Sequence, residues 1–411
     1  MLTIYHKKMI KINTNKKEIN EVLLKGVERI FPNKEALENV LMSGRKIRVY
    51  CGYDPTSPSL HIGHAITLRK LAQFQKLGHE VIFLIGDFTA RIGDPTDKTS
   101  ARKRLTKQEV QKNLKDYKKQ AEKILKFSGK NPVKIMFNSK WNDKLNFPEL
   151  IELSSYFTVH QMLTRDMFQE RIKEKKQIYL HEFLYPLIQA YDSVVMNIDV
   201  EVGGKDQTFN ILCGRDLMKK LKNKEKFALT LKLLTDSSGK KMSKTEGNAV
   251  SLSDNSKEMF GKIMSWPDAS MLSGFEMCTD LTIGEINKIE KDIKDKKINP
   301  KDAKIILAKE IVGVHWSKKD AKDAEKEFNL IFKEKKDPTI IPEIKINQDS
   351  LDILDLLVKT KLVLSKSEAK RMILQGGVKI NSVLQKDWKK VVEIKKGTVV
   401  QVGKRNFVKI S

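Results

Sequence analysis

Two histidines, His61 and His64, stand three residues apart in the stretch SPSLHIGHA, directly after a turn that contains proline. Because residues three apart lie on one face of a helix, both imidazoles can point toward one anion. Gly63 lies between them and lets a ligand approach the backbone closely. Since a helix N-terminus favours anions, the pattern indicates a site for nucleotide phosphates. A four-residue pattern alone is also compatible with two histidines that merely occupy a turn.

A second segment, GKKMSKTEGN at 239–248, carries further residues that can contact phosphate. Lys241 and Lys244 flank Met242 and Ser243 in a loop bounded by glycines, after the last segment with strand character. Lysines on such a loop can close over a pyrophosphate group and stabilise its charge. Taken alone, the segment could equally be a solvated loop in a lysine-rich chain.

The stretch YPLIQAYDS places polar side chains on one face of an otherwise apolar helix. Tyr185, Gln189 and Asp192 fall at positions i, i+4 and i+7. Because buried polar groups need hydrogen-bond partners, this face indicates either a ligand site or an internal network. Asp94, between Gly and Pro in RIGDP, and Tyr50, in a predicted strand, would face the same crevice.

The segments that must position these residues alternate between strand and helix. Short β-branched runs at 46–53 and 80–86 enclose an amphipathic segment at 65–78 that ends in glycine. A second alternation of strand, helix and strand follows at 197–204, 207–221 and 227–234. The two halves predict an α/β fold, a doubly wound Rossmann-type parallel sheet, interrupted by a mostly helical insertion at about 95–175.

Changes of pattern along the chain predict further domains. We expect an N-terminal helical arm, the Rossmann-type domain, an α-helical domain, a proline-containing linker and a small C-terminal α+β domain at 1–45, 46–250, 251–335, 336–350 and 351–411. The last domain is rich in basic residues.

Composition limits the class of protein. A 40% hydrophobic content without a run of about eighteen apolar residues predicts a soluble, cytoplasmic protein with no membrane span. The 3 cysteines lack CxxC spacing, so we expect neither disulfides nor a protein-bound metal. A net charge of +26 suits a partner with many phosphates, although an AT-rich genome would also produce lysine-rich proteins.

Together, HIGH and KMSKT resemble the paired signature of class I aminoacyl-tRNA synthetases. The resemblance sharpens to the bacterial-type tyrosyl-tRNA synthetases over almost the whole chain. The matching stretches, in order, are YCGYDPTSPSLHIGH, LIGDFTARIGDPT, YPLIQAYDS, VGGKDQTFN and KKMSKTEGN. Two departures stand out, Thr245 where the family usually has Ser, and Lys205 where one branch has Ser.

The resemblance implies roles for individual residues. Tyr50 and Asp192 would bind the phenol hydroxyl of tyrosine, and Asp94, Tyr185 and Gln189 its α-ammonium group. The ATP site would include Cys51, Gly52, Asp54, Gly63, Thr67, Gly204, Asp206, Met242 and Ser243, with Gln207 near the tyrosyl group. Catalysis would rest on Thr56, His61, His64, Lys241 and Lys244.

The resemblance also implies the reaction and the partners. L-tyrosine would react with ATP, which carries Mg²⁺, to give tyrosyl-adenylate and pyrophosphate, and the tyrosyl group would pass to the terminal adenosine of tyrosine tRNA. A carboxylate is already ionised at neutral pH, so its activation needs no general base. The family further implies a homodimer through the insertion and an α-helical domain on the anticodon side.

The C-terminal stretch SKSEAKRMILQGGVKIN resembles RNA-binding domains of the ribosomal-protein-S-four type. The resemblance implies that four basic residues contact the RNA backbone, Lys366, Lys370, Arg371 and Lys379. The alternative is a generic small α+β domain with a solvated basic face.

Two other functions stay open on the sequence. One is a tryptophan-charging relative or another nucleotidyltransferase with an HxGH motif. The other is an RNA-binding protein that keeps the synthetase fold only as a scaffold.

Overall fold

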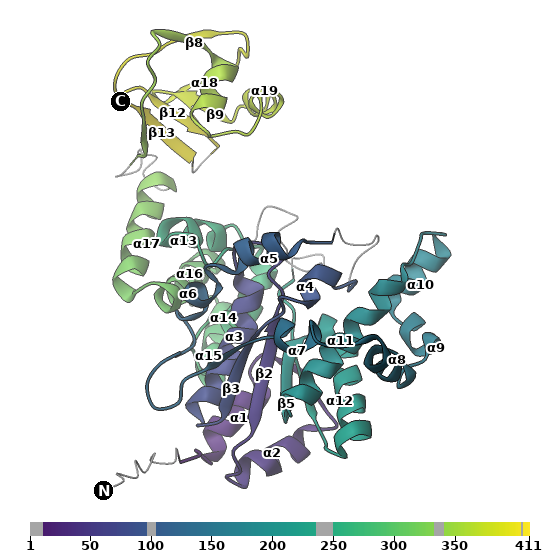
Figure 1. Ribbon diagram of the computed structural model, residues 1–411. Helices are drawn as coiled ribbons and strands as arrows, with labels where there is room; N and C mark the ends of the chain where they lie inside the picture. Colours follow the sequence, from purple (N-terminus) through teal and green to yellow (C-terminus); the bar gives the residue numbers. More distant parts are fainter. Residues whose placement is uncertain (1–10, 97–103, 236–249, 333–340, 404–405) are drawn as a thin grey trace, which may run out of the picture. The chain divides into compact units, whose positions relative to one another are not determined.

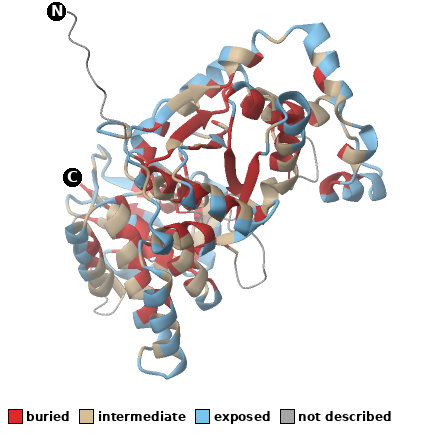
Figure 2. Cartoon of the chain, turned by 90° about the horizontal axis from the view of Figure 1, so that it is seen from below, coloured by how far each residue is buried: buried red, intermediate tan, exposed pale blue. Residues whose placement is uncertain are grey.

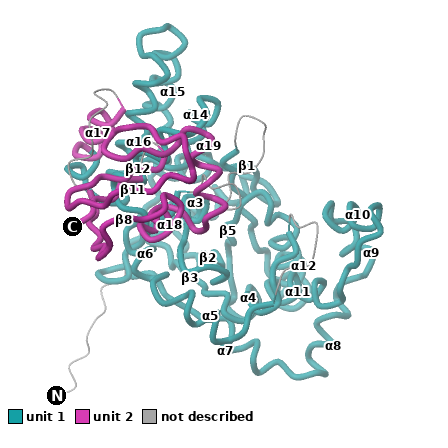
Figure 3. The backbone as a smooth tube through the Cα atoms, turned by 90° about the horizontal axis from the view of Figure 1, so that it is seen from above, with its two compact units in different colours: residues 1–321 teal, residues 322–411 magenta. Residues whose placement is uncertain are grey.

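The computed structural model describes residues 11–96, 104–235, 250–332, 341–403 and 406–411. It divides into two compact units, residues 1–321 and 322–411, shown in teal and magenta in Figure 3. Lys241, Met242, Ser243 and Lys244 lie outside the described residues. Each unit has its own core and is described separately.

The first unit is built on a six-stranded sheet with the order β1-β6-β5-β2-β3-β4 (Figure 1). The strands are β1 (Val27–Phe31), β2 (Arg48–Tyr53), β3 (Glu80–Ile85), β4 (Lys134–Phe137), β5 (Val200–Gly204) and β6 (Phe227–Leu231). All neighbours pair in parallel except β1 with β6. The order runs outward in both directions from β2 and β5, so the predicted doubly wound α/β fold is confirmed. In such sheets ligands bind where the order reverses, at the carboxyl ends of these two strands.

Helices cover both faces of this sheet. On one face, α3 (Ile62–Lys76) connects β2 to β3, and on the other α12 (Thr208–Lys222) connects β5 to β6 and packs against α11 (Leu180–Val195). The four inner strands, β6, β5, β2 and β3, are mostly buried, as Figure 2 shows in red. The remaining helices before α11 are α1 (Lys16–Leu24), α2 (Lys34–Met42), α4 (Thr89–Ile92), α5 (Lys107–Leu114), α6 (Tyr117–Ala121), α7 (Ser139–Asn142), α8 (Phe147–Ser155), α9 (Val159–Leu163) and α10 (Asp166–Lys173).

A helical region follows the sheet, as expected for 251–335. It contains α13 (Ser256–Met264), α14 (Met271–Cys278), α15 (Ile283–Lys294), α16 (Pro300–His315) and α17 (Lys318–Phe332), with short 3₁₀ turns at Lys205–Gln207 and Asp268–Ser270. Several of these helices begin at a side-chain cap, for example Asn255 and Thr282, which accept from the backbone of Glu258 and Glu285.

The second unit has a small α+β core of its own. Its helices are α18 (Ile353–Lys359) and α19 (Lys366–Leu374), and its strands are β7 (Glu343–Ile344), β8 (Ser350–Asp352), β9 (Val378–Ile380), β10 (Val383–Leu384), β11 (Val391–Glu393), β12 (Val399–Val402) and β13 (Asn406–Ile410). Five strands form a sheet in the order β10-β9-β12-β13-β7, and β8 pairs with β11. Leu356, Ile373, Val378 and Val400 lie fully buried within it.

Three strands occur where the sequence predicted helix or linker. β1 lies in the expected N-terminal helical arm, β4 in the expected helical insertion, and β7 in the expected linker. Each is short and lies at a sheet edge, and at most one of its residues is buried. Edge strands bury little apolar surface, so the alternation that identifies a strand in a sequence is weak there.

A buried ion pair connects β5 to the start of β6. Lys226 contacts a carboxylate oxygen of Glu201, and these two side chains are 0% and 2% exposed. Room for the ammonium group comes from Gly214 in α12, where a Cβ atom would lie 2.3 Å from Lys226 Nζ. The glycine is therefore required by the ion pair, although glycine weakens a helix interior.

We predict that Gly214→Ala destabilises the protein by about 1–3 kcal/mol, because the added methyl overpacks the ion pair. Gly313→Ala in α16 is the matched control, since nothing lies within 4 Å of its Cβ position. That control should gain roughly 0.5–1 kcal/mol from helix propensity. Urea unfolding of both variants measures the difference, and a stabilised Gly214→Ala variant would contradict the packing argument.

Candidate active site

The sequence-predicted residues gather where β2, β5 and α3 meet. Asp54 directly follows β2, Asp206 and Gln207 directly follow β5, and His61 is the N-cap of α3. The position is the topological switch point, where parallel strands present their carboxyl ends and a helix presents its N-terminus.

The two histidines of the HIGH motif form one stacked unit. Their ring centroids are 3.8 Å apart. His61 Nδ1 accepts from the backbone N–H of Gly63 at 3.1 Å, and His64 Nδ1 accepts from the backbone N–H of His61 at 3.1 Å. With Nδ1 accepting in both neutral rings, the ring proton is on Nε2, so both present N–H donors. A Cβ at position 63 would lie 2.9 Å from the His61 ring, which explains the glycine.

A single network runs from the end of β2 to α11. Asp54 accepts from the hydroxyls of Tyr185 at 2.9 Å and Thr89 at 2.7 Å. The side-chain amide of Asn138 donates to Thr89 Oγ1 at 3.1 Å and to Asp192 at 3.0 Å. The polar face of α11 therefore has internal hydrogen-bond partners.

Asp192 is buried and accepts from several donors. Besides Asn138, the indole N–H of Trp141 donates to it at 2.7 Å and the amide of Asn142 at 2.9 Å. Burial raises the pKa of Asp192 to about 7, and these three hydrogen bonds oppose that rise. The carboxyl group is thus poised to change charge near neutral pH.

Sequence reasoning missed Thr89, Asn138, Trp141 and Asn142. The last three follow β4, which the sequence did not identify as a strand. Recognising 134–137 as a parallel strand would have placed Asn138 at the carboxyl edge of the sheet. Gly86 was also missed, where a Cβ would lie 1.9 Å from Asp54 Oδ1.

Of the three side chains expected to bind an ammonium group, Tyr185 and Gln189 donate to other residues, and Asp94 only accepts. Tyr185 donates to Asp54, and Gln189 Nε2 donates to Glu201 at 2.9 Å. Asp94 accepts from Gln207 Nε2 at 2.8 Å and from Thr96 Oγ1 at 2.6 Å. A phenol oxygen and an amide oxygen can both accept, as a contact with an ammonium group requires.

Tyr50, in β2, is buried, with an exposed fraction of 1%. Its hydroxyl is 3.0 Å from Ser193 Oγ rather than hydrogen-bonded to Asp192. Burial raises the pKa of Tyr50, and the charges of Glu201 and Asp192 raise it further. The phenol is therefore neutral and can serve only as a hydrogen-bonding group.

The remaining predicted nucleotide residues differ in accessibility. Gly52 and Thr56 are exposed, whereas Cys51 is buried, and burial raises the pKa of its thiol to about 12. Thr67 Oγ1 donates to the carbonyl of His64 at 2.9 Å and is 2.9 Å from the hydroxyl of Tyr53, so it is satisfied internally. Gly204 is required by Asp206, whose carboxylate would lie 2.4 Å from a Cβ there.

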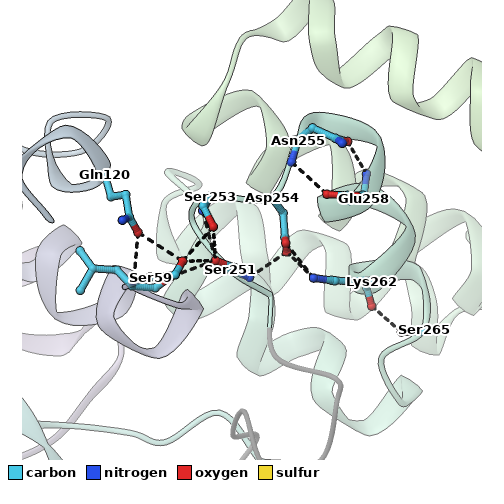
Figure 4. Close-up of polar contacts among 10 residues, drawn as sticks. Ser59, Gln120, Ser251, Ser253, Asp254, Asn255, Glu258, Lys262 and Ser265 are labelled. Carbon is cyan, nitrogen blue, oxygen red and sulfur yellow. Dashed lines mark hydrogen bonds and ion pairs between the residues drawn. The ribbon is translucent and has the colours of Figure 1, made fainter. Parts of the chain in front are cut away.

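Residues 250–252, which follow the predicted lysine loop, form backbone hydrogen bonds with the residues on either side of His61. The backbone N–H of Ile62 donates to Val250 at 2.9 Å, and that of Leu252 donates to Leu60 at 2.9 Å. Figure 4 shows the side-chain hydrogen bonds at this junction, where Ser59 contacts Ser251 and Ser253. The chain thus returns from 236–249 directly next to the HIGH motif.

In the second unit, the four basic residues predicted to contact RNA lie on α19 and β9. Lys366 forms an ion pair with Asp355 at 2.7 Å, and Lys370 Nζ lies 3.8 Å from the ring centroid of Trp388. Arg371 is 3.9 Å from Glu368, and Lys379 is exposed. The exposed groups among them are available to a polyanion.

Within the described ranges, no group of three or more His, Cys, Asp or Glu side chains is arranged to hold a metal ion. A search of the same residues finds no helix with the length and apolarity that crossing a bilayer requires.

Comparison with known proteins identifies the family. Residues 42–333 match the model of class I tRNA synthetases (W and Y), and residues 332–410 match the SYY-like C-terminal domain of tyrosine–tRNA ligases. Tyrosine–tRNA ligase 2 of Clostridium acetobutylicum is 42% identical over 95% of this chain and 97% of its own length. The tyrosine–tRNA ligase of Thermotoga maritima is 43% identical over 95% of this chain and 96% of its own length.

Solved structures agree with the fold. A C-terminally truncated mitochondrial tyrosyl-tRNA synthetase of Aspergillus nidulans superposes with a TM-score of 0.67 at 25% identity, over 77% of this chain and 94% of that one. The Archaeoglobus fulgidus tyrosyl-tRNA synthetase, solved with L-tyrosine, gives 0.59 at 21% identity, over 75% and 98%. By these matches the chain belongs to the class I tRNA synthetases, within the family of the tyrosine–tRNA ligases.

Proposed function

We propose that this chain is a tyrosine–tRNA ligase. It activates L-tyrosine with ATP to give tyrosyl-adenylate and pyrophosphate, and then transfers the tyrosyl group to the 3′-terminal adenosine of tyrosine tRNA. The observation that carries the proposal is the set of hydrogen-bonded side chains around the switch point, with Tyr185 and Gln189 on α11, the buried carboxyl group of Asp192 and the histidine pair at the N-terminus of α3. The family membership agrees with it.

In this proposal the amino acid binds along α11. The ammonium group contacts the oxygens of Tyr185 and Gln189 and the carboxylate of Asp94, and the phenol reaches Asp192 and Tyr50. Phenylalanine lacks the hydroxyl, so it would lose the hydrogen bond to the charged Asp192, worth about 1.5–3 kcal/mol. The same polar end disfavours tryptophan and argues against the tryptophan-charging alternative.

ATP binds at the N-terminus of α3. The Nε2 donors of His61 and His64 and the hydroxyl of Thr56 contact the phosphates, and Asp206 contacts the ribose. Lys241 and Lys244 reach the pyrophosphate, a role supported by the return of the chain at Val250, six residues after Lys244 and about 20 Å of extended chain at most. The further ATP contacts are those of Cys51, Gly52, Asp54, Gly63, Thr67, Gly204, Met242 and Ser243.

The chemistry needs no acid–base residue. The tyrosine carboxylate attacks the α-phosphorus as an anion, so the site acts by positioning the reactants and stabilising charge on the departing pyrophosphate. Mg²⁺ arrives with ATP and adds to that charge stabilisation. Gln207, which donates to Asp94, helps hold the ammonium end in place.

The tRNA, oligomeric and cellular parts of the proposal rest on other features. The basic side chains of the second unit bind tRNA. A homodimer forms through the insertion, which exposes large apolar side chains, Phe147 at 74%, Ile151 at 57% and Val159 at 66%. Such a tRNA-charging enzyme acts in the cytoplasm.

Tyrosine-dependent ATP–pyrophosphate exchange tests the function directly. Wild-type protein should exchange label with tyrosine and far less with phenylalanine or tryptophan. Exchange with tryptophan alone would favour the tryptophan-charging alternative. Absence of exchange with retained tRNA binding would favour the scaffold alternative.

Asp192 generates a pH prediction. Its pKa is raised to about 7, so the fully charged acceptor for the phenol hydroxyl forms as the pH rises through that value. Tyrosine affinity should therefore increase from pH 6 to pH 8, by up to about tenfold per unit below the pKa. Equilibrium dialysis with labelled tyrosine measures it. Asp192→Asn should bind weakly with no such rise, and a flat wild-type profile would contradict the role.

His61 has two roles that one pair of variants separates. His61→Asn keeps a good N-cap, whereas His61→Ala loses it and should be less stable by roughly 1 kcal/mol. Both should lower kcat for exchange by about 10²–10³, the loss typical for one transition-state donor. Pyrophosphate-exchange assays measure kcat, and urea unfolding measures the free energy of unfolding. If His61→Asn kept kcat within about threefold of wild type, the imidazole would have only a capping role.

The basic surface of the second unit should govern salt-dependent tRNA binding. Replacing Lys366, Lys370, Arg371 and Lys379 together with Gln should flatten the slope of log Kobs against log salt by about 0.7–0.9 for each lost phosphate contact. Exchange activity should not change. Lys16→Gln, Lys17→Gln and Lys34→Gln, exposed in the first unit, form the control. An equal loss in both variants would indicate nonspecific attraction only.

A further inference from the structure

The buried ion pair of Glu201 and Lys226 supports two side chains of the proposed tyrosine site, Gln189 directly and Tyr50 through Ser193. Glu201 is in β5, and Lys226 directly precedes β6, the neighbouring parallel strand. Lys226 Nζ contacts Glu201 Oε2 and donates to the carbonyl of Ile211 at 3.2 Å. Neither residue is exposed to solvent by more than 2%, so neither can contact the substrate from the surface.

The carboxylate of Glu201 accepts from two residues of α11. Its Oε1 accepts from Gln189 Nε2 at 2.9 Å, and its Oε2 accepts from Ser193 Oγ at 3.2 Å. Ser193 Oγ is also 3.0 Å from the hydroxyl of Tyr50. Glu201 thus connects the residue at the ammonium end to the residue at the phenol end.

The charge of Glu201 fixes the direction of these hydrogen bonds. A carboxylate only accepts, so the Gln189 amide must turn its NH₂ toward Glu201 and its oxygen away from it. Ser193 has one proton and donates it to Glu201, so the Tyr50 hydroxyl must donate to Ser193 Oγ. Gln189 is consequently left with its amide oxygen as an acceptor, and the Tyr50 hydroxyl is held in place through Ser193.

Stability is a weak explanation for this ion pair. Removing two charges from water is costly, and apolar residues of similar volume often replace buried ion pairs without loss of stability. The fold also omits a side chain at Gly214 in the middle of α12 to admit the Lys226 ammonium group. A requirement for a charge at this point accounts for both features.

We propose that Glu201 is a positioning residue of the tyrosine site, with Lys226 as its counter-charge. It sets Gln189 as the acceptor for the substrate ammonium group and, through Ser193, holds the Tyr50 hydroxyl in place at the phenol end. The inference rests on the proposed function and adds to it two residues that do not touch the substrate. Tyrosine-dependent exchange by the wild-type protein tests the function separately.

The experiment compares Glu201→Gln, Lys226→Met and the double variant Glu201→Gln/Lys226→Met. Each single variant leaves one buried charge unpaired and should lower stability in urea unfolding, and the double variant should recover part of that loss. A neutral amide at 201 can donate or accept, so Gln189 and Tyr50 lose their fixed direction. The KM for tyrosine should therefore rise about tenfold or more in the double variant, with the KM for ATP within about twofold of wild type.

Two further variants locate the effect. Ser193→Ala breaks only the connection to Tyr50. It should therefore lower the preference for tyrosine over phenylalanine by more than a change at the ammonium end alone would. Arg171→Met/Glu182→Gln removes another buried ion pair, whose side chains are 0% and 2% exposed and whose further partners are Gln177 and Tyr179. This control should change stability without changing the KM for tyrosine.

Two results would overturn the proposal. A double variant with wild-type KM for tyrosine would show that the pair only fills the core. A parallel rise in the KM values for tyrosine and ATP would show a general distortion of the sheet.

Discussion

Three buried or half-buried carboxylates, Asp54, Asp192 and Glu201, fix the hydrogen-bond direction of the polar side chains around α11. Each accepts from side chains of other elements, Tyr185 and Thr89 for Asp54, and Gln189 for Glu201. Because a carboxylate cannot donate, the groups around it must direct their protons inward. What remains toward the crevice is a set of oxygen acceptors, which matches an ammonium group and a phenol hydroxyl.

The opposite end of the crevice has the opposite polarity. At the N-terminus of α3, the backbone fixes both imidazoles with Nδ1 as acceptor, so Nε2 presents a proton. Donors at this end suit phosphate oxygens, and the helix N-terminus adds to that preference. The two ends together suit a reaction in which a carboxylate approaches the α-phosphorus of a nucleotide without a general base.

Several segments of the fold supply the partners that stabilise these buried carboxylates. Buried carboxylates need partners, and these come from segments far apart in the sequence, as with Asn138 after β4 and Lys226 before β6. Two glycines leave space for these side chains, Gly86 beside Asp54 and Gly214 beside Lys226. Substitution at these glycines therefore acts on the site through packing against Asp54 and Lys226.

The sequence by itself determined the residues that are adjacent along the chain. The HIGH motif, the polar face of α11 and the strand–helix–strand alternation are local patterns, so they predicted the doubly wound sheet and supplied the candidate site residues. Only the tertiary structure decided which partner each polar group takes, for example Ser193 for Tyr50 and Asn138 for Asp192. It also decided the edge strands β1 and β4. The reason is physical: hydrophobic periodicity reports burial within one segment, whereas hydrogen bonds between segments depend on the register in which the strands pair.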